Sequence, residues 1–363
     1  MIPAPAYNAL SLPRRGATPR PVSLLDSPQF PLDILGIGLS APETTVAASD
    51  VLDGEAARVS EQLGALSEPF RARVLANLGI EAVMREQIAS SREFARRAAV
   101  QALEQAELGG DALGLIVDFT TYAVDAPGIW SLGQDIQHFV QASDAVVVGA
   151  QGSGCCGLHL ALRVAQAFLA ANSELHWALL VASDRAPEGG RVCLPISIMA
   201  DAASAVVVAR AGHNSRRIGR VSAVMTQSSG RFADVLSAEH RPPRIVIDSA
   251  AFERHILPLH FVILNRVLTR ALEAANLAAS AIDALVYPNT TDLDRLSVVR
   301  ALNFDLACLV GPGPRNHGHA FANDLIINAQ ALFSRAEPAP PLHTAWLAAG
   351  SGFTWGAAII DVG

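Results

Sequence analysis

Short apolar runs rich in Val, Ile and Leu alternate with Ala-rich amphipathic stretches along the chain, beginning at Ile34. This alternation predicts buried strands separated by helices, and continuous apolar strands between helices indicate sheets that are covered on both faces. We therefore expect an α/β fold. The expected strands are 113–119, 145–149, 177–182, 205–209, 220–225, 284–287, 307–310, 344–348 and 357–362.

The two halves of the chain repeat one another. Residues 102–117 read ALEQAELGGDALGLIV and residues 271–286 read ALEAANLAASAIDALV, each a helix, a short turn and a buried strand. Further on, AVVVGAQGSGCC (145–156) faces ACLVGPGPRNHG (307–318). Ala-rich helices can produce the first match by chance, but two matches in the same order favour an internal duplication.

The duplication also suggests domain boundaries. Aligning the Gln-Ala pairs of the two following helices places Cys155 opposite His319. We expect an N-terminal extension over 1–30, an N-terminal half over 31–212 that carries Cys155, and a C-terminal half over 213–363.

The composition is that of a compact protein, with 51% hydrophobic and 17% charged residues over 363 positions. The net charge is −7 and no segment clusters basic with aromatic residues, which argues against nucleic acid as a partner. No apolar run approaches the roughly 18 residues of a membrane span. The first 30 residues lack the apolar core of a signal peptide. We therefore expect a cytoplasmic protein with no membrane partner.

Two residue types exclude further classes of chemistry. All 27 basic residues are Arg, so Schiff-base chemistry, pyridoxal phosphate anchoring and a Walker-A phosphate lysine are excluded. The four Cys residues have neither a zinc-ligand spacing nor the pattern of a disulfide framework. We expect no metal site.

Cys155 is the candidate nucleophile. It lies in the run Gly-Ser-Gly-Cys-Cys-Gly over 152–157, between an expected strand and an expected helix. Small neighbours let a substrate carbonyl approach, and the helix N-terminus stabilises a thiolate and a developing oxyanion. Cys156, Cys193 and Cys308 fit better as small buried side chains.

A nucleophilic thiolate needs a group that manages protons. His317 and His319 lie in the counterpart of the Cys155 segment, just before an expected helix. Asn289 follows the expected strand 284–287, and ligands of open α/β folds gather at the carboxyl ends of strands. The other histidines have no comparable setting.

These motifs resemble those of the thiolase superfamily, and specifically of β-ketoacyl-acyl-carrier-protein synthase III. The most specific match is GSGFTWG over 350–356, where the family has Gly-Gly-Gly-Phe-Thr-Trp-Gly. Cys-Cys-Gly over 155–157 resembles the family's Cys-Ala-Gly, and ADAASA over 200–205 partly matches Gly-Asp-Gly-Ala-Gly-Ala. The resemblance extends from Ile34 to Gly363, with the motifs in the same order.

Two departures from the family pattern exchange a His and an Asn. Asn289 stands where the family has its catalytic His, and His319 stands where the family has its catalytic Asn. The family uses this pair to donate hydrogen bonds to a thioester oxygen as it becomes an enolate, and both side chains can donate from either position. Alternatively, condensation is lost and His319, oriented by Asp324, is a general base for acyl transfer.

The resemblance implies further features of the site and its substrates. The backbone N–H groups of Cys155 and Ser351 would form the oxyanion hole, His317 would have a supporting role, and Gly350, Gly352 and Phe353 would form a substrate loop. The implied fold has five layers, α/β/α/β/α, built from two duplicated halves, and the implied assembly is a homodimer.

The implied reaction forms an acyl-Cys155 intermediate and condenses it with a malonyl-type thioester, with Asn289 and His319 stabilising the enolate. The donors would be acyl-CoA or acyl-carrier-protein phosphopantetheine thioesters, with no permanently bound cofactor. Transfer of the acyl group to an alcohol or amine is the alternative reaction. A non-catalytic partner subunit with this fold is a further alternative, and the retained Cys155 counts against it.

The resemblance leaves the donor-binding face open. Where the family has a Trp, the stretch 68–80 offers only Phe70, with Arg71 and Arg73 beside it. These two charges suit a carrier-protein surface, a phosphate or a solvated helix face.

Overall fold

The computed structural model describes residues 30–363 except 64–66, 123–130, 214–215, 241–242 and 335–339. Almost all of the expected N-terminal extension lies outside the described residues.

Among the described residues, nine strands form one large sheet in the order β13-β14-β15-β10-β1-β9-β6-β4-β5. The five strands of its N-terminal part are β1 (Leu32–Ser40), β4 (Leu115–Asp118), β5 (Val146–Gly149), β6 (Trp177–Asp184) and β9 (Ala202–Arg210). The four strands of its C-terminal part are β10 (Gly219–Ser228), β13 (Ala284–Val286), β14 (Leu342–Gly350) and β15 (Thr354–Val362). Within the described part of the chain, only the pairs between 32–34 and 219–221 join the two parts, through β1 and β10.

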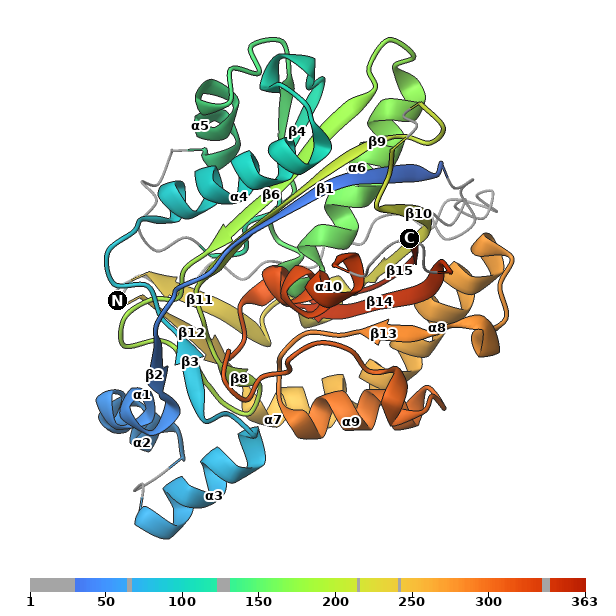
Figure 1. Cartoon of the computed structure of the whole chain (residues 1–363). Coiled ribbons are helices and arrows are strands. Elements are labelled where there is room, and N and C mark those ends of the chain that lie inside the picture. Colours follow the sequence, from blue (N-terminus) through green and yellow to red (C-terminus); the bar gives the residue numbers. More distant parts are fainter. Residues whose placement is uncertain (1–29, 64–66, 123–130, 214–215, 241–242, 335–339) are drawn as a thin grey trace, which may run out of the picture.

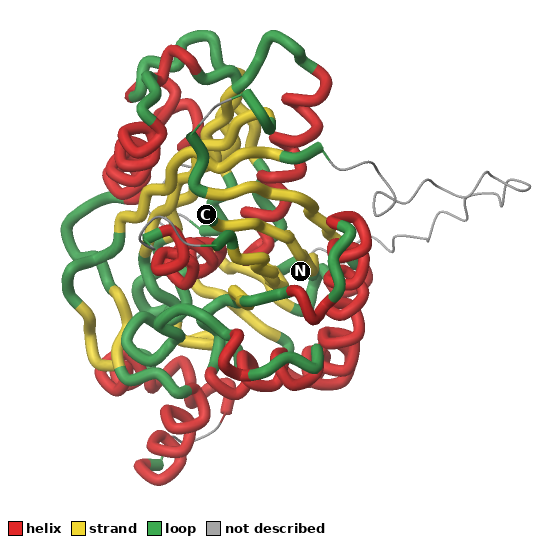
Figure 2. Tube along the Cα trace, turned by 45° about the vertical axis from the view of Figure 1, so that its right-hand side comes forward, coloured by secondary structure: helices red, strands yellow, loops and turns green. Residues whose placement is uncertain are grey.

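Helices cover both outer faces of the two sheet parts and fill the space between them (Figures 1 and 2). The outer helices are α4 (Ser91–Ala106) and α5 (Leu132–Phe139) on one side, and α8 (Leu257–Ala275) and α9 (Asp292–Ala301) on the other. The middle layer holds α6 (Gly157–Ala171) and α10 (Asp324–Phe333). This arrangement is the expected five-layered α/β/α/β/α fold.

The core reflects these layers. Leu158 of α6 and Leu325 of α10 belong to one apolar cluster together with Leu180 of β6 and Ile360 of β15, so the middle helices pack on both sheet parts. Separate clusters lie under α4 and under α8. Each fully buried Leu or Ile stabilises the fold by about 1.5–3 kcal/mol.

The two halves repeat the same order of elements, which confirms the duplicated architecture. In both halves a first strand leads to a long helix, α4 or α8, and then to a parallel strand, β4 or β13. Both long helices end at a residue in the left-handed region, Glu107 at φ 56° and Asn276 at φ 55°. The matching sequences 102–117 and 271–286 cover these helix ends and the strands that follow.

Two sequence expectations about strands need correction. Residues 307–310 do not form a strand: a 3₁₀ turn runs over Leu306–Cys308, capped by Asp305, and only one parallel bridge joins Leu309 to Leu285. Conversely, β1 is a strand that the expected set lacks. Its apolar pattern is interrupted by Gly36 and Gly38. A Cβ on Gly38 would lie 1.9 Å from the Ala98 carbonyl oxygen, so this glycine lets α4 pack directly on β1.

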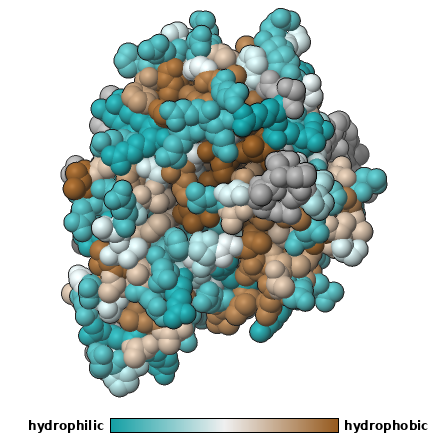
Figure 3. All heavy atoms as spheres, viewed as in Figure 1, coloured by the Kyte–Doolittle hydropathy of each residue, from teal (hydrophilic) through white to brown (hydrophobic). Residues whose placement is uncertain are grey.

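The remaining elements lie outside the large sheet and its covering helices. The short strand pairs are β2 (Thr45–Ala47) with β3 (Ala82–Met84), β7 (Val192–Cys193) with β8 (Ser197–Ile198), and β11 (Leu236–His240) with β12 (Pro243–Ile247). The additional helices are α1 (Ala48–Gly54), α2 (Ala56–Leu63), α3 (Glu68–Leu78) and α7 (Ser249–Ala251), with a π-helical turn over Phe252–Ile256 before α8. On the face shown in Figure 3, hydrophilic residues dominate the upper part, and apolar residues show nearer the middle and the lower edge.

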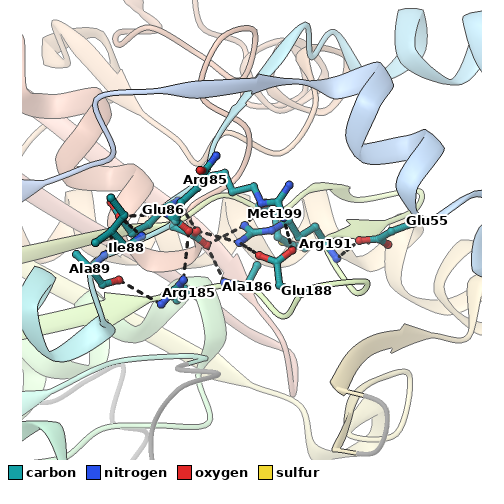
Figure 4. A network of polar contacts seen from close by, with 12 residues as sticks. Glu55, Arg85, Glu86, Ile88, Ala89, Arg185, Ala186, Glu188, Arg191 and Met199 are labelled. Carbon is teal, nitrogen blue, oxygen red and sulfur yellow. Dashed lines mark hydrogen bonds and ion pairs between the residues drawn. The ribbon is translucent and has the colours of Figure 1, made fainter.

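A buried ion-pair network fixes the segment 185–201 (Figure 4). Arg191 donates to both carboxylate oxygens of Asp201, at 2.8 and 2.9 Å, and both side chains are almost fully buried. Glu55 accepts the backbone N–H of Arg191 at 2.7 Å. Asp201, the acidic residue of the partly matched ADAASA motif, is therefore a structural anchor for this segment.

One described segment, Gly154–Ala171, is long and apolar enough to cross a membrane by length and composition. It is not a continuous apolar run, because it contains His159, Arg163 and Gln166. The segment consists of α6 and the turn before it, and its apolar character follows from its place between the two sheet parts.

Candidate active site

Cys155 lies on the turn that links β5 to α6. Gly152 (φ 89°) and Gly154 (φ 51°) adopt the left-handed backbone region that favours glycine. A 3₁₀ turn over Gly154–Cys156 follows, and α6 begins at Gly157. Cys155 is partly exposed and lines a cavity formed by the described residues.

Cys156 faces the opposite way. It is fully buried, and its Sγ lies 3.1 and 3.0 Å from the carbonyl oxygens of Ala348 and Thr354, either of which can accept its S–H. Burial and the neighbouring Cys155 charge raise the pKa of the Cys156 thiol well above its ordinary value. Of the two adjacent cysteines, only Cys155 is arranged to react with a ligand in the cavity.

His319 connects Cys155 to a buried carboxylate. Its Nε2 lies 3.0 Å from Cys155 Sγ, and its Nδ1 lies 2.5 Å from Asp324 Oδ2. Burial alone would lower the pKa of His319, but the Cys155 and Asp324 charges and their hydrogen bonds raise it well above its ordinary value. The three side chains form a Cys-His-Asp triad.

Backbone groups fix both members of the His-Asp pair. The His319 N–H donates to the Ile198 carbonyl at 2.9 Å, so the segment fixed by Asp201 also positions the histidine. Asp324 is the first residue of α10, where the helix dipole favours a negative charge. Its carboxylate accepts the N–H groups of Ala320 and Asn289 at 2.8 and 2.7 Å.

Asn289, expected from the sequence to act beside His319, is bonded to Asp324 and Asn328. Its side chain is fully buried and does not line the cavity. The amide Nδ2 lies 3.4 Å from Asp324 Oδ1, and the amide oxygen accepts from Asn328 Nδ2 at 2.8 Å. Both polar atoms of the Asn289 amide thus have partners among Asp324 and Asn328.

The loop over 350–353 packs on the Cys155 turn. A Cβ on Gly154 would lie 2.4 Å from the Ser351 amide nitrogen, and a Cβ on Gly350 would lie 2.8 Å from the Cys155 amide nitrogen. The two amide groups are therefore neighbours at the cavity wall, as an oxyanion hole built from them requires. Gly350, Ser351, Gly352 and Phe353 all line the cavity, whereas His317 does not.

The cavity has a volume of about 660 Å³ and mainly apolar walls. Apolar side chains come from the segment after Arg191, from the π-helical turn and α8, and from the loop before α10; they include Ile196, Met199, Phe252, Leu257, Phe261 and Phe321. The polar side chains on the wall formed by α8, α9 and the segment before α9 are His260, Tyr287, Thr290, Thr291, Asp294 and Ser297. No sequence motif marks these residues as part of a site, although Tyr287 and Thr290 flank the Pro-Asn pair at 288–289.

Arg71 and Arg73 lie on α3, away from the residues that line the cavity. Arg71 forms ion pairs with Asp53 and Glu68, and the Arg73 guanidinium lies 5.3 Å from the centre of the Phe70 ring. These contacts fit a charged helix face.

No protein-family model matches the sequence. No curated protein matches it either.

Solved structures match nearly the whole chain. The 3-oxoacyl-[acyl-carrier-protein] synthase III from Aquifex aeolicus VF5 superposes with a TM-score of 0.73 at 18% identity, over 91% of this chain and 99% of its own. The acyltransferase ChlB3 superposes with a TM-score of 0.75 at 22% identity, over 92% of this chain and 98% of its own. A variant of OleA from Xanthomonas campestris superposes with a TM-score of 0.76 at 16% identity, over 92% of this chain and 99% of its own. These likenesses confirm, at the level of the fold, the resemblance that the motifs indicate.

Proposed function

We propose that this chain, which has the fold of a β-ketoacyl-acyl-carrier-protein synthase III, is an acyltransferase. Cys155 accepts an acyl group from a thioester, and His319, held by Asp324, transfers that group to an alcohol or amine. The single observation that carries the proposal is the contact of 3.0 Å between Cys155 Sγ and His319 Nε2, with Asp324 on the other ring nitrogen.

The proposed reaction has two steps. The Cys155 thiolate attacks the donor thioester, and the leaving thiolate takes the proton from the His319 imidazolium. The neutral His319 then removes a proton from the acceptor, which attacks the acyl-Cys155 carbonyl and expels the Cys155 thiolate. The imidazolium and the thiolate are thereby restored. The Cys155 and Ser351 amides would stabilise the oxyanion in both steps.

Condensation with a malonyl-type thioester is the other reaction that the sequence resemblance implies. In that reaction, Asn289 and His319 would both donate to the same enolate oxygen. The bonds of the Asn289 amide to Asp324 and Asn328 count against this arrangement. A non-catalytic partner subunit is disfavoured because it has no need for the Cys155–His319–Asp324 contacts.

For the donor we propose an acyl-CoA or acyl-carrier-protein thioester, with no permanently bound cofactor. The support is the fold, which is shared with a 3-oxoacyl-[acyl-carrier-protein] synthase III. The volume of the cavity, about 660 Å³, also suffices for an acyl chain with part of its carrier arm.

The test combines acyl loading with a comparison of two substitutions. The protein is incubated with acyl thioesters, and peptide mapping locates the added mass, which we expect on Cys155 and not on Cys156. Turnover with alcohol and amine acceptors is then measured for His319→Ala and Asn289→Ala. We expect His319→Ala to lose about 10²–10⁴-fold in rate, as is usual for removal of a general base. The loss for Asn289→Ala should stay below about tenfold, because this residue acts only through Asp324.

Three outcomes contradict the proposal. Acylation that persists in Cys155→Ala would exclude the nucleophile. Release of carbon dioxide from a malonyl thioester by the wild type, abolished in Asn289→Ala, would establish condensation instead. A folded wild type that takes up no acyl group from any thioester would favour the non-catalytic alternative.

A further inference from the structure

A connected group of polar side chains interrupts the apolar wall of the cavity. Trp355 Nε1 donates to His260 Nδ1 at 3.2 Å, and His260 Nε2 lies 3.2 Å from the Tyr287 hydroxyl oxygen. Because Nδ1 accepts, the proton of a neutral His260 is on Nε2, and it is donated to Tyr287. The Tyr287 hydroxyl group then donates to Asp294 Oδ2 at 3.0 Å. Every donor in this chain of hydrogen bonds points towards Asp294.

The Asp294 carboxylate is held firmly but has one open oxygen. Oδ2 accepts from Tyr287 and also from Thr290 Oγ1, at 2.7 Å. The Asp294 N–H donates to Thr291 Oγ1 at 3.0 Å, which fixes the residue in the first turn of α9. Among the described residues, no donor lies within hydrogen-bond distance of Oδ1; His260 Nε2 is 3.9 Å away. The side chain is 26% exposed, and the residue lines the cavity.

No Arg or Lys side chain in the described wall of the cavity balances this carboxylate, and the His319 imidazolium is already paired with Cys155 and Asp324. The lining residues include Asp294 but no Arg, and the sequence contains no Lys. Burial lowers the pKa of His260, so its ring is neutral at physiological pH. Arg295 is the next residue in the chain, but its guanidinium donates to the Val310 carbonyl, and the residue does not line the cavity. An anionic acceptor is disfavoured in such a cavity, and a cationic one is favoured.

We infer that the acyl acceptor is an amino alcohol, bound with its ammonium group on Asp294 Oδ1 and its hydroxyl group towards Cys155 and His319. This inference rests on the proposed acyl transfer and names its acceptor. Cys155, His319 and Asp294 line the same cavity, and the acceptor would span the cavity between them. The bond to the carboxylate keeps the amine protonated, and a protonated amine is not a nucleophile. The hydroxyl group is therefore the group that is acylated.

The transfer step balances without any further reactant. The hydroxyl proton moves to His319 Nε2, and the hydroxyl oxygen bonds to the acyl carbon. The bond between this carbon and Cys155 Sγ breaks, and Cys155 leaves as a thiolate beside the new imidazolium. The ammonium group keeps its protons, so the product is an ester that carries a free amine.

The first measurement tests cation binding without acyl transfer. Iodoacetamide alkylates Cys155 in the presence of hexylamine, an ammonium ion at pH 7, or of hexan-1-ol, and peptide mapping follows the modification. We expect half-protection of the wild type at an at least tenfold lower concentration of the amine than of the alcohol. Asp294→Asn should abolish this difference. Asp292→Asn removes the same charge from the same turn of α9 at an exposed position outside the cavity, and it should keep the difference.

The second measurement tests the acceptor itself. Acyl-enzyme is offered amino alcohols of two to six carbons and the neutral alcohols of matching length, and ester formation is followed by mass spectrometry. We expect the wild type to prefer the amino alcohols, and Asp294→Asn to raise their KM by about 10–100-fold, the usual effect of losing one charge-assisted hydrogen bond. Neutral alcohols should be unaffected by the substitution.

The outcomes separate this inference from the proposed function. Equal protection by amine and alcohol in the wild type, or a difference that survives in Asp294→Asn, would overturn the ammonium site. Acylation of the amine nitrogen would overturn the assignment of the hydroxyl group as the nucleophile. Failure of Cys155 to take up an acyl group would instead overturn the proposed function. The wild-type comparison needs no variant, so it decides the matter even if Asp294→Asn does not fold.

Discussion

The charge on His319 depends on a thiol on one side and a carboxylate on the other. Burial disfavours the imidazolium, yet the Cys155 and Asp324 charges outweigh it and raise the pKa of His319. Asp324 follows His319 by five residues and is the first residue of α10, where the helix dipole stabilises its negative charge. Its carboxylate therefore lies beside the His319 ring. Asn289 takes part in the same arrangement through its backbone and side-chain bonds to Asp324.

Substitution of Asp324 by Asn should lower the pKa of His319, because the imidazolium loses one of its two negative partners. NMR titration of ¹⁵N-labelled histidine measures this pKa directly. A histidine whose pKa is raised by folding stabilises the folded state fully below its unfolded pKa, and this contribution is lost as pH rises through the folded pKa. The difference in unfolding free energy between wild type and variant should therefore shrink as pH rises. The exposed change Asp292→Asn is the control, and an unchanged His319 pKa in Asp324→Asn would refute the coupling.

At the scale of elements, the turn before α6 determines how closely the 350–353 loop approaches Cys155. Gly154→Ala would add a Cβ within 2.4 Å of the Ser351 amide nitrogen at a position with φ 51°. The loop must then shift, and strain in the left-handed region adds about 1–2 kcal/mol. We expect a lower melting temperature and a strongly reduced rate of Cys155 acylation.

Gly54→Ala is the control, because the added Cβ finds no atom within 4 Å and the residue has no positive φ. Its melting temperature and acylation rate should stay close to those of the wild type. Unchanged acylation in a folded Gly154→Ala protein would show that the close contact with Ser351 is not needed for the reaction.

How far the sequence predicts these elements depends on the range of the contacts that form them. The Cys155 turn follows from local residues, a strand, small residues and a helix, and its partner His319 follows from the duplication. The orientation of the Asn289 amide depends on Asn328, 39 positions later in the chain, so its motif cannot reveal it. The Tyr287–His260–Asp294 group likewise needs the packing of α8 beside α9. Apolar periodicity also misses β1, whose glycines serve the contact with α4.

At the scale of the whole molecule, the duplication explains where the site lies. Cys155 comes from the N-terminal half, whereas His319, Asp324 and Asp294 come from the C-terminal half. The two turns that lead into the middle helices, α6 and α10, bring the nucleophile and the base together. We therefore infer that neither half alone can carry the chemistry, because each supplies only one side of the Cys155–His319 contact.

The end of the large sheet at β5 leads to a prediction about assembly. β5 reads VVVG, it is the last strand in the order of the sheet, and its Val146 side chain is 47% exposed. An exposed apolar edge strand is a template for pairing with another chain. We predict that two copies form a homodimer through their β5 edges, which extends the sheet across both subunits.

Light scattering coupled to size-exclusion chromatography should give twice the mass of 38.1 kDa. Val146→Lys places a charge on this edge and should give the monomer mass. Val262→Lys, at a site on α8 that is 54% exposed, should leave the dimer intact. A wild-type monomer, or a Val146→Lys dimer, would refute pairing through β5.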